Sequence, residues 1–192
     1  MPFALLAAWA RVASPAPWEP AILDAASIGH DTLADIVVAI NVLGNLPVWA
    51  VLVAILAAGA LALRRIVAAE LIGLSFASDL AAFTIKLLVE RQRPDTAAAE
   101  HVLGFDSFAF PSGHVVRAVA LVAVLAWLAA PRRARLPLAV AGGTLAGLVM
   151  GYARVALNVH WPTDAIGGTL LGIGWFSLSV LLLGRPRRTW RT

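Results

Sequence analysis

The chain has 192 residues, of which 60% are hydrophobic and 14% are charged, and its mean hydropathy is +0.84. This composition excludes an ordinary soluble domain and predicts a membrane protein. The formal charge of +4 could indicate a nucleic-acid partner, but the arginines lie in short clusters between apolar runs. We interpret them as topology signals and expect no nucleic-acid binding. Because the sequence has no cysteine, disulfides, thiolate metal ligands and cysteine nucleophiles are excluded.

The first 44 residues predict only short helices. Residues 3–13 are apolar but interrupted by Arg11, and their length suits a short or partial span rather than a full crossing, which needs about 20 residues. From Asp31, a good N-cap residue, apolar side chains recur at helical spacing until Gly44, a residue typical of helix ends. This pattern predicts an amphipathic helix at the membrane interface. Its apolar residues are Leu33, Ile36, Val37, Ile40 and Leu43.

Five longer apolar segments follow, and each is suited to crossing a bilayer. They cover residues 46–63, 66–89, 112–130, 136–156 and 164–184. The predicted fold class is therefore all-α, an integral-membrane helical bundle of five to six spans with an interfacial amphipathic helix. Since no internal repeat or low-complexity linker divides the sequence, we expect one membrane-embedded domain over residues 1–192, with a functional core at about 30–184.

Arginine clusters close the first, third and fifth of these segments. They are Arg64 with Arg65, the cluster at 132–135, and the cluster at 185–191. Alternating spans put all three clusters on one side of the membrane, which the positive-inside rule makes the cytoplasm. The loop at about 90–111 and the turn at 157–163 are then expected on the extracytoplasmic side of the cell membrane. These two segments contain most of the polar residues that could carry chemistry.

The first of three polar clusters joins Lys86 to Arg93 and Pro94. The two cations are seven residues apart and share a helix face for as long as the helix persists. Pro94 disfavours helical geometry at Arg93, so we expect the helix to end about there, with both cations at the membrane surface. The alternative is a helix end at which two cations extend towards water and bind no ligand.

The second cluster is Pro111, Ser112, Gly113 and His114, at the start of an apolar run. Ser112 is a good N-cap, Gly113 permits close backbone approach, and the free N–H groups of a first helical turn form an anion site. His114 would face an anion that is held there. The alternative is an ordinary helix cap beside a surface histidine.

The third cluster runs from Arg154 through His160 to Asp164. Pro162 suits the first position of the last span, which places Asp164 in its first turn and His160 just before it. A carboxylate four residues along can accept a hydrogen bond from one imidazole nitrogen, so that the other nitrogen presents its lone pair as a nucleophile. The alternative is a capping aspartate beside a buried histidine.

Together, the three clusters supply the groups that hydrolysis of a phosphate ester requires. These are cations for the phosphate oxygens, an oriented nucleophile and an acid for the leaving oxygen. The main chemical competitor is a metal site built from two histidines and one aspartate. We favour the phosphate site, because the neighbouring cations would repel a divalent ion. We therefore expect no metal and no other cofactor.

Two further ionisable residues lie within the predicted spans. Asp79 is expected to face another helix rather than lipid, in a structural role. Arg117, one turn after His114, could extend a headgroup site or reach outward to water. Trp49 and Trp161, near span ends, fit the aromatic belts found at membrane interfaces.

The three clusters resemble the motifs of the type 2 phosphatidic acid phosphatase superfamily, also called lipid phosphate phosphatases, which shares its site with vanadium haloperoxidases. The family pattern is Lys, six residues, Arg-Pro; then Pro-Ser-Gly-His; then Ser-Arg, five residues, His, three residues, Asp. The matching residues are Lys86, Arg93, Pro94, Pro111, Ser112, Gly113, His114, Arg154, His160 and Asp164. One departure is Ala153, which stands where the family has a serine.

The resemblance implies a role for each matched residue. His160 would be the nucleophile, Asp164 its orienting partner and His114 the general acid. The residues that would hold the phosphate are Lys86, Arg93, Ser112, Gly113 and Arg154. The resemblance also implies a metal-independent reaction through a phosphohistidine intermediate.

The predicted function is that of an integral-membrane phosphatase acting on a lipid phosphate monoester or a polyprenyl diphosphate. Bacterial undecaprenyl diphosphate, phosphatidylglycerophosphate and phosphatidate would all fit. A lipid phosphotransferase could use the same site to pass the phosphoryl group from His160 to a second lipid. A transporter or structural membrane protein is the alternative from another class, but it gives no reason for three motifs on one side of the bilayer. The expected partners are the lipid substrate and the bilayer, and the oligomeric state is left open.

Overall fold

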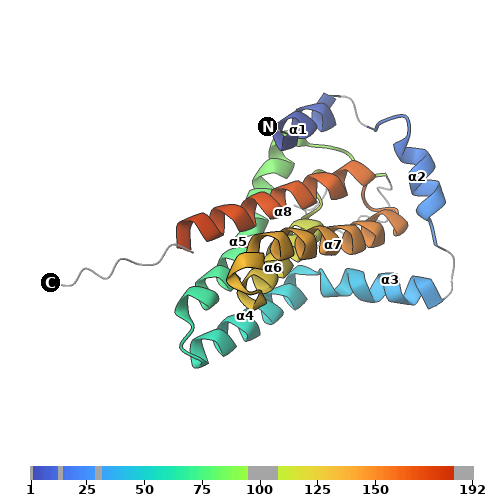
Figure 1. Cartoon of the computed structure of the whole chain (residues 1–192). Coiled ribbons are helices and arrows are strands. Elements are labelled where there is room, and N and C mark those ends of the chain that lie inside the picture. The colour runs from blue at the N-terminus through green and yellow to red at the C-terminus, as the bar shows by residue number, and fades with distance from the viewer. Residues whose placement is uncertain (1, 13–14, 29–31, 95–107, 184–192) are drawn as a thin grey trace.

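The computed structural model describes residues 2–12, 15–28, 32–94 and 108–183. These residues form eight α-helices and one short 3-10 helix, and no strand occurs among them (Figure 1). The elements are α1 (Pro2–Val12), α2 (Glu19–Ala26), α3 (Thr32–Leu43), α4 (Leu46–Ala62), α5 (Ile66–Val89), α6 (Gly113–Ala129), η1 (Arg132–Ala134), α7 (Arg135–Ala156) and α8 (Pro162–Leu183). The predicted all-α class is confirmed, and the five predicted long segments coincide with α4 to α8.

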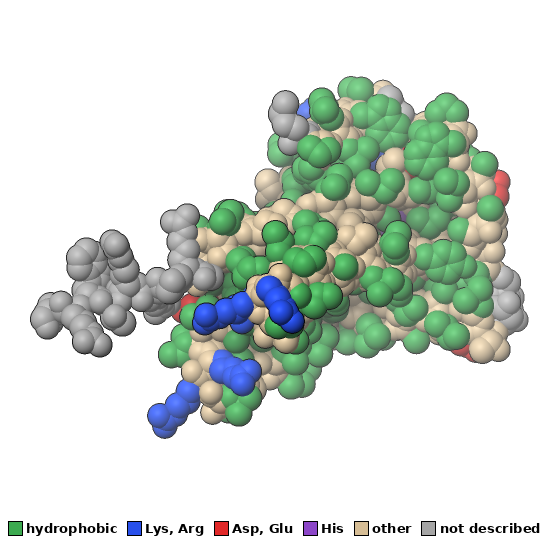
Figure 2. Space-filling view, viewed as in Figure 1, with side chains coloured by type: hydrophobic (Ala, Val, Ile, Leu, Met, Phe, Trp, Pro, Cys, Tyr) green, Lys and Arg blue, Asp and Glu red, His purple; other side chains and the backbone are tan. Residues whose placement is uncertain are grey.

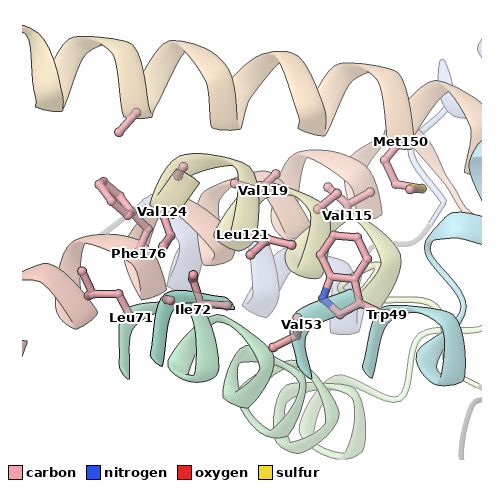
Figure 3. Packing of buried hydrophobic residues seen from close by; sticks show 14 of the residues in the cluster. Trp49, Val53, Leu71, Ile72, Val115, Val119, Leu121, Val124, Met150 and Phe176 are labelled. Carbon is pink, nitrogen blue, oxygen red and sulfur yellow. The ribbon is translucent and has the colours of Figure 1, made fainter. Parts of the chain in front are cut away.

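α6 lies at the centre of the bundle and packs against α5, α7 and α8. Every residue from 114 to 121 is buried, so this part of the helix is enclosed on all sides. Its apolar side chains meet Leu71 and Ile72 of α5 and Phe176 of α8 in one continuous core (Figure 3). Trp49 of α4 belongs to the same core and is 5% exposed, so its prediction as an interfacial tryptophan is wrong.

Two glycines of α8 let α6 approach closely. A methyl group added at Gly172 would lie 2.7 Å from the Cβ atom of Val119 and 3.0 Å from the carbonyl oxygen of Val116. One added at Gly168 would lie 2.9 Å from the carbonyl oxygen of Ser112. Close backbone approach through small residues is typical of helix pairs in membranes. The beginnings of α6 and α8, where the candidate site residues lie, are therefore held close together.

Three helical segments are long and apolar enough to span a membrane. They are α5, α8, and α7 together with η1 (Arg132–Ala156). α3 and α4 qualify only as a pair that is bent by 63°. The described residues thus offer three spans, or four if the bent pair is one span. The predicted number of five to six spans is larger because it counts α1 and α6, which are shorter apolar helices. With 17 residues, α6 is about 26 Å long, whereas the hydrocarbon core of a bilayer is about 30 Å thick.

The helix predicted to lie at the interface is α3, and part of it packs against the bundle. Val37 is 1% exposed and packs with Ala153 and Ala156 of α7. The exposed members of its predicted apolar face are Leu33, Ile36 and Leu43. The predicted N-cap, Asp31, lies outside the described residues. α3 therefore places the bend that follows it, at residues 44 and 45, against the bundle rather than away from it.

Exposed arginines gather at one end of the bundle. Arg64 and Arg65 lie at the turn between α4 and α5, and Arg132 and Arg133 lie in η1 between α6 and α7. Figure 2 shows basic side chains in two groups at the lower left, over these two connections, on a face that is otherwise mainly hydrophobic. The third predicted cluster, at 185–191, lies outside the described residues. The candidate site lies at the opposite ends of these helices, where α5 ends and α6 begins (Figure 1).

We predict that Gly172→Ala destabilises the bundle. The added methyl group would overlap Val119, so α6 and α8 would have to separate, at a cost of about 1–3 kcal/mol. Gly174→Ala, on the same helix, is the matched control because a methyl group there meets no atom within 4 Å. Thermal unfolding of both variants in detergent measures the difference. Equal midpoints for the two variants would contradict the close packing of α6 on α8.

Candidate active site

His160 and Asp164 form the centre of the candidate site. His160 lies in the turn between α7 and α8, and Asp164 lies in the first turn of α8, as the sequence predicts. The Nδ1 atom of His160 is 3.2 Å from the Oδ2 atom of Asp164, and both residues are buried. Because an ionised carboxylate can only accept, Nδ1 carries the proton and Nε2 presents its lone pair. In the part of the chain that the structure describes, Nε2 makes no hydrogen bond.

Two further donors hold Asp164 as a carboxylate. Its Oδ2 atom accepts the backbone N–H of Trp161 at 2.8 Å, and its Oδ1 atom accepts a hydrogen bond from Arg91 at 2.6 Å. The side chains of Arg91 and Asp164 are both fully buried. Bonds of this kind favour the charged form of the carboxylate and fix its plane. The carboxylate therefore has the charge and the orientation that an imidazole nucleophile requires of its partner.

Positive charges surround the His160 imidazole. Burial, followed by the charges of Arg154 and Arg93, lowers the pKa of His160 well below its ordinary value of 6.5. The ring is therefore neutral at pH 7, which is the form that has a lone pair to donate. The same charges would stabilise an anion placed beside the ring.

α5 ends one turn earlier than the sequence predicts. Its last residue is Val89, and Glu90 adopts the left-handed conformation with a φ of 53°, while its N–H donates to the carbonyl oxygen of Lys86 at 2.9 Å. In the non-helical segment that follows, Arg91 and Arg93 are buried and the residue between them is exposed. The prediction that Lys86 and Arg93 share a helix face is therefore wrong. Arg93 reaches the site from the segment after the helix.

The three predicted phosphate-binding cations approach His160 from different elements. Lys86 comes from α5, Arg93 from the segment after it and Arg154 from the last turn of α7. Each is between 5% and 7% exposed, and the charge of each acts on the His160 ring. Lys86 donates to the Phe108 carbonyl oxygen at 2.6 Å, and Arg93 donates to the Val159 carbonyl oxygen at 3.3 Å. Arg154 donates to the side-chain oxygen of Asn41. These acceptors are neutral, so these particular bonds position the cations without adding a negative charge beside them.

Ser112 occupies the predicted N-cap of α6, but its hydroxyl does not cap the helix. The Oγ atom is buried and has no hydrogen-bond partner among the described residues. A buried hydroxyl in this state is costly, so it is suited to donate to a ligand oxygen. The backbone N–H of Ser112 donates to the carbonyl oxygen of Asp164 at 3.1 Å, which joins the start of α6 to the first turn of α8. The N–H groups that begin at Gly113 have the position of a helix-terminal anion site.

Both ring nitrogens of His114 are in hydrogen bonds. Nδ1 lies 3.3 Å from a guanidinium nitrogen of Arg117, and Nε2 lies 3.0 Å from the side-chain oxygen of Asn45. Because a guanidinium can only donate, Nδ1 is the acceptor, and the neutral ring carries its proton on Nε2. That proton points to Asn45, at the bend between α3 and α4. His114 thus presents a hydrogen-bond donor at Nε2, whereas His160 presents a lone pair at its own Nε2 atom.

Arg117 is held in turn by Asp79 of α5, at a distance of 3.1 Å between Nη1 and Oδ1. The expectation that Asp79 faces another helix is confirmed. Of the two alternatives for Arg117, the outward one is wrong, because the residue is buried and its guanidinium group contacts His114. The two histidines therefore have opposite partners at Nδ1, a carboxylate for His160 and a guanidinium for His114.

Four residues that support the site were not predicted from the sequence. They are Glu19, Asn41, Asn45 and Arg91. Arg91 lies between Lys86 and Arg93, so the presence of a third cation within the first motif could have indicated that it has a role at the site. The other three meet their site partners across separations of 69 to 144 residues along the chain, which local spacing does not indicate.

The structure places all eight predicted site residues at one end of the bundle. They are Lys86, Arg93, Ser112, Gly113, His114, Arg154, His160 and Asp164. Within residues 2–12, 15–28, 32–94 and 108–183, no group of three or more His, Asp or Glu residues is arranged to hold a metal ion. The arrangement can bind an anion, present an imidazole lone pair to it and supply a proton from a second imidazole.

Comparison with known proteins gives matches in sequence and in structure. The family model of the PAP2 superfamily matches residues 47–188, which include all eight predicted site residues. Phosphatidylglycerophosphatase B of Bacillus subtilis (strain 168) is 35% identical over 133 residues, or 66% of this chain and 64% of that protein. Decaprenylphosphoryl-5-phosphoribose phosphatase of Mycobacterium tuberculosis (strain ATCC 25618 / H37Rv) is 36% identical over 101 residues, or 51% of each chain. The chain thus spans between half and two thirds of the length of these relatives.

A solved structure has a similar fold over nearly the whole chain. It is the crystal structure of a transmembrane PAP2 type phosphatidylglycerolphosphate phosphatase from Bacillus subtilis. The TM-score is 0.80 at 28% sequence identity, and the match covers 97% of this chain and 94% of that chain. The match extends to the N-terminal helices, which precede the residues matched by the family model.

Proposed function

The chain belongs to the PAP2 superfamily, and on this premise we propose that it is an integral-membrane phosphatase acting on a lipid phosphate monoester or diphosphate. The observation that carries the proposal is the geometry around His160, whose Nδ1 atom is held by Asp164 while buried cations surround the ring. The relatives support the substrate class, because one is named a phosphatidylglycerophosphatase and the other a decaprenylphosphoryl-5-phosphoribose phosphatase. Both names denote phosphatases of lipid-linked substrates.

The reaction begins with binding of the phosphate group. Lys86, Arg93 and Arg154 neutralise the charge on its oxygens, and the Ser112 hydroxyl and the Gly113 N–H donate to the same oxygens. Because these donors are buried, they act more strongly than they would in water and need little reorganisation when charge shifts during the reaction.

His160 then attacks the phosphorus atom with the lone pair of Nε2. An N–P bond forms while the P–O bond to the lipid breaks, and the electrons of that bond leave with the lipid oxygen, which takes a proton from His114. Asp164 stabilises the positive charge that develops on the His160 ring. Water next attacks the phosphohistidine and gives a proton to His114, the N–P bond breaks, and inorganic phosphate leaves. His160 is then neutral again, and His114 is again in the protonated form that it had with the substrate bound.

His114 must be protonated before it transfers a proton to the leaving oxygen, so that its ring is neutral after the transfer. In the free site, Arg117 donates to its Nδ1 atom, which favours the neutral ring. A bound phosphate brings negative charge to the ring and favours its protonated form. Arg117 can then leave Nδ1 while it keeps its ion pair with Asp79. The Nε2 proton, which faces Asn45 in the free site, becomes available to the leaving oxygen.

The direct test is phosphate release by the purified protein from a panel of lipid phosphates and diphosphates in detergent. We expect release in the presence of EDTA, because the site supplies its own cations, and inhibition by vanadate, which resembles the five-coordinate phosphorus of the transition state. His160→Ala should abolish turnover of every substrate. Activity that EDTA removes and a divalent ion restores would contradict this mechanism. Transfer of phosphate to a second lipid, without release of inorganic phosphate, would identify a phosphotransferase.

A second prediction concerns the proton that His114 gives to the leaving oxygen. An alkyl alcohol is a far weaker acid than p-nitrophenol, so only the alkoxide depends strongly on a proton donor when it leaves. His114→Ala should therefore damage hydrolysis of an alkyl lipid phosphate far more than phosphoryl transfer from p-nitrophenyl phosphate. The variant should also release one burst of p-nitrophenol and then stall as phosphohistidine, since it lacks the base for water. Equal losses on both substrates, with no burst in rapid mixing, would exclude His114 as the general acid.

We further propose that the site faces the extracytoplasmic side of the cell membrane. The exposed arginines at the opposite end of the bundle support this orientation through the positive-inside rule. In this cysteine-free chain, Gln92→Cys at the site end should react with an impermeant thiol reagent added to intact cells. Ala134→Cys in η1 should react only after the cells are opened. The reverse labelling pattern would overturn the proposed orientation.

A further inference from the structure

A buried polar network lies directly behind Asp164, on the side away from His160. Its members are Glu19 of α2, Arg91 after α5, and Thr163 in the first turn of α8. The side chains of Glu19 and Arg91 are both 0% exposed. We propose that Glu19 and Arg91 are positioning residues of the active site, which fix Asp164 and through it the tautomer of His160. The proposal rests on the proposed function for its catalytic consequence.

Arg91 is the centre of this network. One guanidinium nitrogen donates to the Oδ1 atom of Asp164 at 2.6 Å and to the Oγ1 atom of Thr163 at 2.5 Å, and the other donates to the Oε2 atom of Glu19 at 2.6 Å. The guanidinium carbon also lies 5.5 Å from the ring centre of Trp9 and 5.8 Å from that of Trp161. Contacts with two aromatic rings and with two carboxylates leave the guanidinium plane little freedom. Asp164 is consequently held in one rotamer.

Glu19 takes the place of a capping side chain for α8. Its Oε1 atom accepts the backbone N–H of Thr163 at 3.1 Å and the Thr163 hydroxyl at 2.5 Å. Its Oε2 atom accepts the backbone N–H of Ala16 at 2.8 Å as well as the bond from Arg91. A carboxylate at the first turn of a helix satisfies N–H groups that have no partner within the helix. Glu19 therefore fixes both the turn that carries Asp164 and the arginine that holds it.

The charges of the network are matched to the reaction. Glu19 and Asp164 carry two negative charges and Arg91 one positive charge, which leaves one negative charge behind the His160 ring. That charge is balanced when the ring becomes positive during attack on phosphorus. Without the Glu19 charge, Arg91 would cancel the charge of Asp164, and the ring would lose this stabilisation.

Glu19 also lies outside the residues that the family model matches. The family model begins at residue 47, whereas Glu19 belongs to α2, and Trp9 belongs to α1. Both helices pack against α8. The N-terminal helices therefore supply part of the support for the catalytic turn, although none of the predicted site residues lies in them.

The test compares Glu19→Gln with Glu90→Gln in the full-length protein. The first variant removes the buried charge and nearly preserves side-chain shape, whereas the second removes an exposed carboxylate one residue from Arg91. We expect Glu19→Gln to lower kcat about 10- to 100-fold with little change in KM, because substrate still binds to the cations while His160 is misplaced. Glu90→Gln should keep wild-type kcat. Wild-type kcat for Glu19→Gln, or a loss confined to KM, would overturn the proposal.

A double-variant comparison separates positioning from general damage. If Glu19 acts through Asp164, then Glu19→Gln should cause no further loss of kcat in an Asp164→Asn background. An equal loss in both backgrounds would mean that Glu19 affects folding or packing alone. Thr163→Val, which removes the hydroxyl between Arg91 and Glu19, provides a milder variant should Glu19→Gln fail to fold. It should lower kcat in the same direction, and an unchanged kcat would count against the network.

Nitrogen NMR of the ¹⁵N-histidine-labelled protein tests the network without turnover. In the wild type, His160 should show a protonated Nδ1 and an unprotonated Nε2, and its signals are assigned by their loss in His160→Gln. Glu19→Gln should move both signals towards the average of the two tautomers, whereas Glu90→Gln should not. Unchanged signals in Glu19→Gln would overturn the proposal. Absence of wild-type turnover would contradict the proposed function instead, and the NMR result would still decide the role of Glu19.

Discussion

One constraint on this bundle is that, among the residues the structure describes, more cations than carboxylates are buried at one end of an apolar interior. Five buried cations lie at that end, namely Lys86, Arg91, Arg93, Arg117 and Arg154. Three carboxylates accompany them, Glu19, Asp79 and Asp164. Counted over these eight described residues alone, the cations exceed the carboxylates by two, and a phosphate monoester carries a charge of about −1.5 to −2. Because buried charge is costly inside a protein, binding of an anion beside these cations would be favourable.

The different surroundings of the two histidines explain how two identical side chains take different roles in the proposed mechanism. A carboxylate at Nδ1 of His160 frees the Nε2 lone pair, and in the proposed mechanism it stabilises the positive ring that forms during attack. A guanidinium at Nδ1 of His114 keeps a proton on Nε2 and opposes a permanent positive charge. Each partner is itself held by an ion of opposite charge, Arg91 for Asp164 and Asp79 for Arg117. The proposed assignment of nucleophile and acid thus depends on residues that need not touch the substrate.

Much of the helical framework and all of the motif positions could be predicted from the sequence. Long apolar runs with clear end signals define helices locally, and Pro162 marks the start of α8 as expected. The end of α5 was misplaced because the left-handed conformation of Glu90 has no signal in a residue that is neither Gly nor Asn. Trp49 was misplaced because its position near a helix end does not reveal whether its side chain faces the core.

The support of the site could not be predicted, because it is made by contacts between distant segments. Glu19 meets Thr163 across 144 residues, and Asn45 meets His114 across 69. Such contacts exist only after the helices have packed, and glycines of α8 are among the positions where that packing is close. The backbone bond from Ser112 to Asp164 then joins the start of α6 to the first turn of α8. Because a displacement of about 1 Å can cost a reaction about 100-fold, the glycines that bring α6 and α8 together would also set the geometry in which phosphate meets His160 in the proposed mechanism.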